Sequence, residues 1–311
     1  HFLENVIDAN NYPLEAITNL AQRIRRIGLG VMGLADVFVR LEIPYDSAEA
    51  VDLGRKIQRF VDHEAKIESE RLAGIRGPFA EWERSIWGPD ASCARDAAGN
   101  RIRPMQKLRN CNVTTVAPTG TISIIAGCSS GIEPLFAVAF LRNQAGVLMP
   151  DVNEDFVRVA RAEGWYSAEL MLKIAEMGHI RFDEVPVKWQ RIFVTANEIR
   201  PEWHVRMQAA FQEHNDSAIS KTVNFANSAT EQDVDQIYRL AYGLECKGVT
   251  VYRDGSRNMQ VLSTGTTAKM VRADATKSGK SEARADLGEV LDTATTSERR
   301  ALVADIAGEL A

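Results

Sequence analysis

A regular spacing of apolar residues runs along the chain from Leu20 to Leu41. Apolar positions recur there at alternating steps of four and three, which is the period of an α-helix that buries one face. The positions are Leu20, Ile24, Ile27, Val31, Leu34, Phe38 and Leu41. The pattern predicts one long buried helix through this region.

A second helix is predicted to begin at Asp46, because Glu49 stands three residues later and can complete a capping box. Its predicted buried face carries Leu53, Ile57, Phe60 and Ile67. The residues that follow, 77–110, combine Pro and Gly with Trp82 and Trp87, and we expect them to form a long loop.

Beyond residue 110, short apolar runs alternate with amphipathic stretches. Strands are expected at 112–116, 135–141, 222–225 and 248–252. Helices are expected at 153–163, 167–177 and 202–214, and from a cap at Ser228 and Glu231 to about Glu245. Strands that alternate with helices favour a mostly parallel α/β sheet or barrel.

The composition changes after Tyr252. Residues 253–311 contain no Phe, Trp, Tyr or Cys, and 263–286 are rich in Ser, Thr, Gly, Lys, Ala and Asp, as flexible linkers are. Thr295–Leu310 has the pattern of one short amphipathic helix, capped by Thr295 and Glu298. We therefore expect a folded part over 1–262 and a low-complexity linker with a short helical tail over 263–311.

Composition and charge exclude several classes of function. The 311 residues are 45% hydrophobic and 25% charged, as in globular proteins, and the net charge of -5 gives no overall attraction for nucleic acid or an anionic membrane. No apolar run approaches the roughly 20 residues of a membrane span. We expect a cytoplasmic protein without membrane or direct nucleic-acid partners. Because position 1 is His and the first Met is Met32, we also expect a fragment of a longer chain.

Gly28–Gly33 spells GLGVMG and fits the GxGxxG fingerprint of dinucleotide-binding folds. In such folds an apolar strand precedes the glycines, whereas Gln22–Arg26 carries three arginines. The predicted helix also continues through the motif, so its glycines are interpreted as points of close packing. A nicotinamide-dependent dehydrogenase is kept only as an alternative that this motif would favour.

The stretch VAPTGTISIIAG, residues 116–127, places small hydroxyl residues and a glycine between apolar flanks. Thr119, Thr121 and Ser123 offer hydroxyl donors, and Gly120 lets backbone amides approach an anion closely. A helix that begins at Ile122 would add free amide groups. The stretch lacks Gly-Lys-Ser/Thr, so it is not a Walker loop. The residues alone leave two interpretations open: an anion-binding loop, or a hydroxyl-rich turn.

Other candidate groups are interpreted as structural. Glu133 could act as a general acid whose pKa is raised by burial, but a carboxylate that accepts backbone hydrogen bonds is the favoured interpretation. Cys128, without a neighbouring His or Cys, is assigned to packing. The four cysteines have no zinc or CxxC spacing, so reduced thiols are expected. The five histidines have no metal-ligand spacing, and no metal is expected.

Several stretches together resemble the large chains of ribonucleotide reductases. Residues 26–36, 220–224 and 247–255 fit the family, and VTTVAPTGTISIIAGCSSGIEPLF (113–136) closely resembles its adenosylcobalamin-dependent, class II branch. The segments occur in family order over about residues 1–262. The resemblance implies the C-terminal part of a ten-stranded α/β barrel, with a flexible tail.

The resemblance also implies a reaction and a site. Ribonucleotides would be reduced to deoxyribonucleotides by a thiyl radical that adenosylcobalamin (vitamin B12) initiates. The thiyl takes the 3′ hydrogen, water leaves C2′, and a cysteine pair closes to a disulfide. In the family, the substrate's phosphates are bound by the residues that here are Pro118, Thr119, Gly120, Thr121, Ile122 and Ser123.

The departures from the family pattern concern the chemistry itself. The family's Asn-x-Cys-x-Glu motif is absent, so the catalytic cysteines are expected upstream of His1 and the chain alone is expected to be inactive. The expected partners are a ribonucleoside di- or triphosphate, a thioredoxin-type reductant and the missing N-terminal part. Oxygen-dependent relatives carry two adjacent tyrosines where this chain has Tyr252 and Arg253, which favours the cobalamin branch. A non-catalytic, nucleotide-binding half of a split reductase is the alternative.

Overall fold

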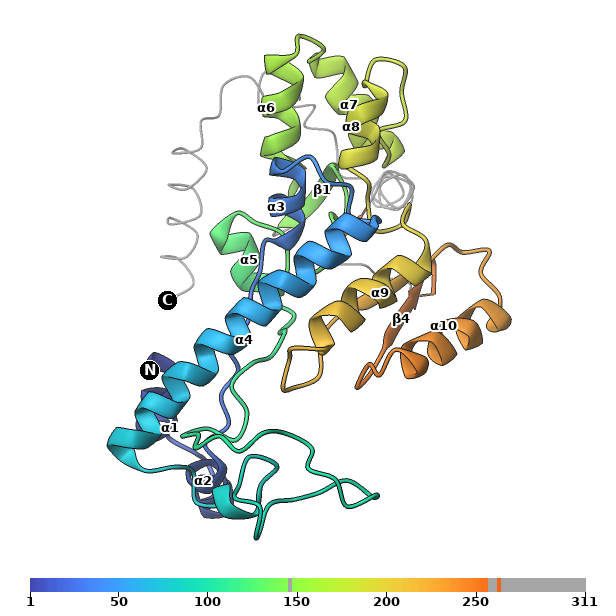
Figure 1. Cartoon of the computed structure of the whole chain (residues 1–311). Helices are drawn as coiled ribbons and strands as arrows, with labels where there is room; N and C mark the ends of the chain where they lie inside the picture. Colours follow the sequence, from blue (N-terminus) through green and yellow to red (C-terminus); the bar gives the residue numbers. More distant parts are fainter. Residues whose placement is uncertain (145–146, 257–261, 264–311) are drawn as a thin grey trace. The chain divides into compact units, whose positions relative to one another are not determined.

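The computed structural model describes residues 1–144, 147–256 and 262–263 (Figure 1). The chain forms two compact units. One comprises His1–Pro134 and Ala196–Ser256, and the other is built around Leu135–Thr195. None of the helices in the described ranges is long and apolar enough to cross a membrane. The predicted boundary at residue 262 stays a prediction, and the predicted linker and tail helix beyond residue 263 lie outside the described residues.

The first unit holds most of the helices and the parallel strands. Its elements are α1 (Phe2–Ala9), α2 (Glu15–Ile24), α3 (Leu34–Arg40), α4 (Ala48–Arg76), α5 (Gly120–Ala126), α9 (Pro201–Gln212), β3 (Thr222–Phe225), α10 (Glu231–Gly243) and β4 (Thr250–Arg253). Between α4 and α5, the expected long loop contains one short 3-10 turn, Trp82–Arg84.

The single long helix predicted over Leu20–Leu41 is wrong. α2 ends at Ile24 and α3 begins at Leu34. The residues between them are partly extended: the Leu29 amide donates to Val113 O at 2.8 Å, and Leu29 forms a parallel bridge with Thr114. The apolar period was misleading, since Leu20 and Leu41, at its two ends, are 54% and 56% exposed.

Two glycines explain why this segment pairs as a strand. A Cβ on Gly28 would lie 2.5 Å from Thr115 Cγ2, and a Cβ on Gly30 would lie 2.2 Å from Thr115 O. Glycine therefore permits the close approach of two backbones. Gly28 and Gly30 lie inside the paired segment, where Thr115 is packed directly against them. The rejection of the dinucleotide fingerprint holds for this reason, and not for the helix that was expected.

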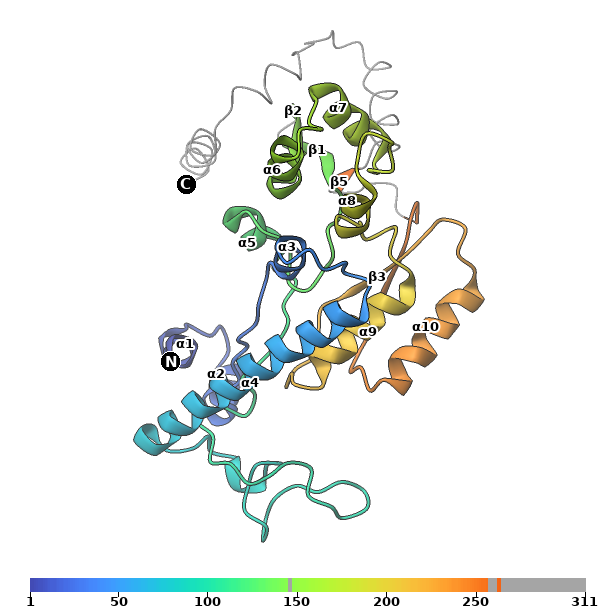
Figure 2. The ribbon, with the colours of Figure 1, turned by 45° about the horizontal axis from the view of Figure 1, so that its top comes forward.

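The second predicted helix exists but buries a different face. α4 begins after Ser47, whose hydroxyl accepts from the Ala50 amide at 3.1 Å, so the cap is not Asp46. Phe60 and Ile67 of the predicted apolar face are exposed. The helix instead packs on α9, beside which it runs in Figures 1 and 2. A Cβ on Gly54 would lie 2.8 Å from the Phe211 ring.

Parallel extended segments form the centre of the first unit. β3 pairs with β4 in parallel, with Thr222 opposite Thr250. Further along, Val116 bridges Ile219, and Thr114 bridges Leu29, both in parallel. The expected strand at 112–116 is therefore present as two isolated bridges. The predicted mostly parallel arrangement is confirmed in this unit.

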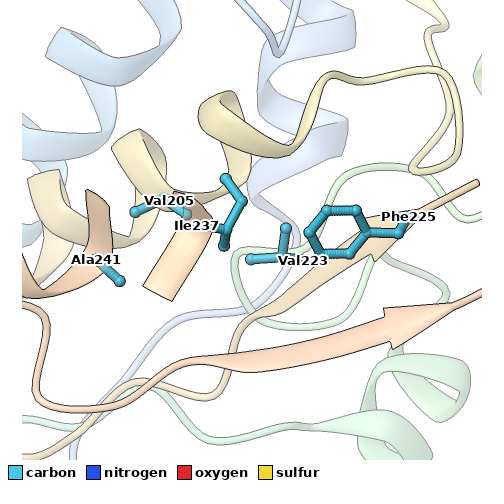
Figure 3. Close-up of a cluster of buried hydrophobic side chains, with 5 residues drawn as sticks. All are labelled: Val205, Val223, Phe225, Ile237 and Ala241. Atoms are coloured by element: carbon cyan, nitrogen blue, oxygen red, sulfur yellow. The ribbon is translucent and has the colours of Figure 1, made fainter. Parts of the chain in front are cut away.

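β3, α9 and α10 enclose an apolar core. Its fully buried members are Val205, Val223, Phe225, Ile237 and Ala241, which Figure 3 draws. β3 has the predicted bounds, and β4 begins two residues later than expected. The cap of α10 is Thr230 with Asp233, which form a capping box in place of the predicted Ser228 and Glu231.

The second unit combines an antiparallel hairpin with three helices. Its elements are β1 (Ala139–Gln144), β2 (Val147–Val152), β5 (Leu262–Ser263), α6 (Glu154–Ala162), α7 (Ala168–Met177) and α8 (Val187–Ile192). β1 pairs with both β2 and β5. The strand predicted at 135–141 is shifted, since it begins at Ala139. α6, α7 and α9 match predicted helices within two residues at each end, whereas α8 was not predicted.

Candidate functional site

The hydroxyl-rich stretch forms a tight turn followed by the short helix α5. Thr119 precedes the helix with φ 53° and ψ 22°, a left-handed conformation that is unfavourable for a residue with a side chain. Its Oγ1 accepts a hydrogen bond from the Gly131 amide at 2.8 Å, which holds the turn to a later part of the chain. The helix begins at Gly120, two residues before the expected start, and ends at Ala126, followed by Gly127 in a left-handed conformation.

The three hydroxyl side chains of this turn have different surroundings. Thr119 is engaged with Gly131 as just described. Ser123 is buried, donates to Gly120 O at 3.1 Å, and lies 2.8 Å from the Ser130 hydroxyl. Thr121 is exposed, and its side chain makes no hydrogen bond within the described part of the chain. Two hydroxyls thus shape the loop, and Thr121 presents its hydroxyl to solvent.

The start of α5 is open to solvent. Pro118, Gly120, Thr121 and Ile122 are all exposed. A Cβ placed on Gly120 would have no atom of the described residues within 4 Å. The amides in the first turn of a helix have no partner inside the helix, so this end offers several backbone donors to an external acceptor. Of the six predicted residues, these four are exposed, Thr119 is half-buried and Ser123 is buried.

The return segment after α5 is fixed by a network around α3. The Ser129 amide donates to Asp36 Oδ2 at 2.7 Å, and the Gly33 amide donates to Ser129 O at 2.8 Å. Burial and the nearby Asp36 carboxylate raise the pKa of the Cys128 thiol. The protonated thiol is therefore favoured, as the expected packing role of Cys128 requires.

Glu133 accepts hydrogen bonds from two neighbouring residues. Its Oε1 accepts from the Thr222 amide at 2.7 Å, and its Oε2 accepts from Lys221 Nζ at 2.5 Å. These contacts support the structural interpretation of Glu133. Lys221 itself is fully buried and also contacts His204. Sequence reasoning missed this cluster because its members lie 88 and 17 positions from Lys221.

The Tyr252–Arg253 pair can also be placed. Tyr252 lies on β4 opposite Asn224 and is half-buried, and the neighbouring Arg253 is exposed. Among the residues that the structure describes, no group of three or more His, Cys, Asp and Glu side chains could hold a metal ion.

Comparisons with known proteins point to one family. The family described as "Ribonucleotide reductase, barrel domain" matches residues 1–252. The chain is 47% identical over 266 residues to the vitamin B12-dependent ribonucleoside-diphosphate reductase of Thermoplasma acidophilum, covering 85% of this chain and 33% of that protein. The protein of the same name from Mycobacterium tuberculosis H37Rv is 47% identical over 263 residues, covering 84% and 35%.

A solved structure has a similar fold. The Actinobacillus ureae class Id ribonucleotide reductase alpha subunit matches with a TM-score of 0.65 at 20% identity, over 81% of this chain and 44% of that one. The predicted α/β class and reductase barrel are confirmed. The chain spans about a third of the length of the curated relatives and matches their C-terminal part.

Proposed function

The chain belongs to the ribonucleotide reductase barrel family, and we propose that it is the C-terminal part of the catalytic chain of a vitamin B12-dependent ribonucleoside-diphosphate reductase. The proposed reaction converts ribonucleotides to deoxyribonucleotides, the precursors of DNA, in the cytoplasm. The identity of 47% to two proteins of that name supports this assignment.

The proposed contribution of this chain is the binding of the substrate's phosphates. The residues assigned are Pro118, Thr119, Gly120, Thr121, Ile122 and Ser123. The observation that carries the proposal is the open end of α5, where an exposed glycine stands among amides without helical partners. Uncharged backbone amides would thus bind the phosphates by hydrogen bonds, with the exposed Thr121 hydroxyl as a further donor. A nucleoside diphosphate is the substrate that fits the relatives' names.

The reactive sulfurs are proposed to lie in another part of the enzyme. None of the four cysteines stands in an Asn-x-Cys-x-Glu motif. We therefore assign the radical cysteine and the reducing pair to a preceding N-terminal part, which would be a partner of this chain. A thioredoxin-type protein would restore the reduced pair.

Adenosylcobalamin is the proposed cofactor, and when bound it supplies the radical that initiates the reaction. Among the described residues, no cluster of side chains is suited to a metal ion, and we assign none of these residues to the cofactor. The residues of this chain act on the substrate: the α5 turn binds and orients its phosphates.

The test of this function uses the complete polypeptide. It should reduce a ribonucleoside diphosphate when supplied with adenosylcobalamin and a dithiol, and residues 1–311 alone should not. Turnover by residues 1–311 alone would contradict the assignment of the reactive cysteines. If those cysteines belong to a separate polypeptide, activity should appear when the two chains are mixed.

The phosphate site is tested by Thr121→Val in the complete polypeptide. Loss of a hydroxyl bond to a charged group should weaken substrate binding by about 1.5–3 kcal/mol. Equilibrium binding of a nucleoside diphosphate measures the effect. The control is Thr18→Val, which removes the hydroxyl of a half-buried threonine on α2, and it should leave the affinity unchanged. Equal affinities for the Thr121→Val variant and the unaltered enzyme would favour the alternative interpretation, in which residues 116–127 form only a hydroxyl-rich turn.

A further inference from the structure

Lys221 is a charged side chain enclosed by the protein. Its side chain has no exposed surface. The ammonium donates three hydrogen bonds: to Glu133 Oε2 at 2.5 Å, to His204 Nδ1 at 2.8 Å and to Thr222 O at 2.6 Å. An ammonium has three N–H donors, so each of them is used. The group is held in one orientation by partners from three parts of the chain.

His204 serves as a fixed, neutral acceptor in this cluster. Because Nδ1 accepts from Lys221, the ring proton stands on Nε2, which donates to Ala196 O at 3.2 Å. Burial and the charge of Lys221 lower the pKa of His204 to about 2. The imidazole therefore stays neutral near pH 7 and fixes the ammonium that points to Glu133.

Glu133 connects this cluster to the α5 turn. The carboxylate is held by two consecutive residues, Lys221 and the Thr222 amide. Its own amide donates to Ser130 O at 2.9 Å, which closes the turn of residues 130–133. That turn contacts both Thr119, the residue before α5, and α5 itself. The Gly131 amide donates to the Thr119 hydroxyl, and the Ser130 hydroxyl lies 2.8 Å from that of Ser123.

We propose that Lys221 is a positioning residue for the phosphate-binding turn: through Glu133 it fixes the 130–133 turn, which holds Thr119 and α5 in the orientation that binds substrate. This inference rests on the proposed function. Stability alone does not explain the pair, because buried ion pairs are often replaced by apolar groups without loss of stability. Apolar side chains at these two positions would pack, but they could not form the directional hydrogen bonds that fix residue 133.

The experiment separates positioning from stability with two variants of the complete reductase. Lys221→Met removes the ammonium and leaves Glu133 without its cation. The double variant Glu133→Gln and Lys221→Met removes both charges, and should recover the thermal stability that the single variant loses. In both variants KM for the nucleoside diphosphate should rise by about tenfold or more, with kcat within about twofold.

Lys66→Met is the matched control. Lys66 is largely buried and forms ion pairs with Asp62 and Asp216 in the same unit, but it makes no contact with the 130–133 turn or α5 among the described residues. Its loss should lower stability and leave KM unchanged.

A stable double variant whose KM equals that of the unaltered enzyme would overturn the positioning role, because KM would then follow stability alone. If Lys221→Met does not fold, the double variant alone decides the question. Failure of the unaltered enzyme to bind or reduce a nucleotide would instead refute the proposed function, so the two failures are distinguishable.

Discussion

Replacing Gly120 by alanine should stabilise the fold while it weakens substrate binding. Gly120 is the first residue of α5, it is exposed, and its φ is not positive. An added Cβ meets no atom of the described residues within 4 Å, so the folded protein gains no clash. Alanine restricts the unfolded chain more than glycine does, which should raise the free energy of unfolding by about 0.4–1 kcal/mol.

In the proposed site, the same methyl group would stand where a phosphate would approach the amides of the first turn. Losing one hydrogen bond to a charged group costs about 1.5–3 kcal/mol, which corresponds to a loss of affinity of roughly 10- to 140-fold. Stability and affinity should therefore change in opposite directions. A residue that served only the fold would not produce this divergence.

The assay compares Gly120→Ala with Gly74→Ala in the complete reductase. Gly74 lies exposed within α4, and its added Cβ also meets no described atom within 4 Å. Thermal unfolding should show both variants at or above the stability of the unaltered protein. Titration with a nucleoside diphosphate should show weak binding only for Gly120→Ala. The reasoning is refuted if Gly120→Ala keeps full affinity, or if Gly74→Ala loses as much.

Two further predictions concern the fold. Gly30→Ala should lower the free energy of unfolding by about 1–3 kcal/mol, since its Cβ would lie 2.2 Å from Thr115 O and force two backbones apart; a urea curve like that of the unaltered protein would contradict this. His204 has a pKa of about 2 in the fold against an ordinary value of 6.5, so it stays neutral where the unfolded chain binds a proton. Its contribution to stability is thus complete above pH 6.5 and falls by up to about 1.4 kcal/mol per pH unit below it. Urea unfolding at several pH values should show a shallower slope for His204→Gln, and an equal slope would exclude His204 as the source.

Local patterns predicted the elements whose burial follows the usual apolar scale. In β3 every second residue is apolar and buried, namely Val223 and Phe225. The sequence predicts this strand with the observed bounds. α6 and α7 carry apolar faces and side-chain caps next to their first residues. In these elements propensity, capping and burial agree, so the sequence is sufficient.

Close backbone contacts defeated the same reasoning elsewhere. The face of α4 toward α9 uses Ala50 and Gly54, which contribute little to an apolar pattern, while Phe60 stands exposed. Gly28 and Gly30 likewise mark a strand contact, at a place where the apolar period predicted a continuous helix. A glycine indicates only that room is needed. What requires the room is a residue distant in sequence, such as Thr115 or Phe211.

For the candidate site, the sequence predicts the position of the turn but not the contacts of each hydroxyl group. The sequence located the turn, because hydroxyl residues and a glycine between apolar runs are unusual. It could not distribute the roles of Thr119, Thr121 and Ser123, because the partners of the first and third are Gly131 and Ser130. These contacts depend on how the chain returns after α5.

The proposed phosphate site relies on uncharged groups because the nearby charged side chains are already paired with each other. Lys221 is linked to this turn through Glu133, but its three donors are already taken and Glu133 balances its charge. Its ammonium is therefore not available to a phosphate. With the hydroxyls of Thr119 and Ser123 used to shape the turn, the first-turn amides of α5 and the Thr121 hydroxyl are the groups left to bind an anion. In the proposed site, the buried ion pair would supply rigidity, and backbone dipoles would supply the attraction for an anion.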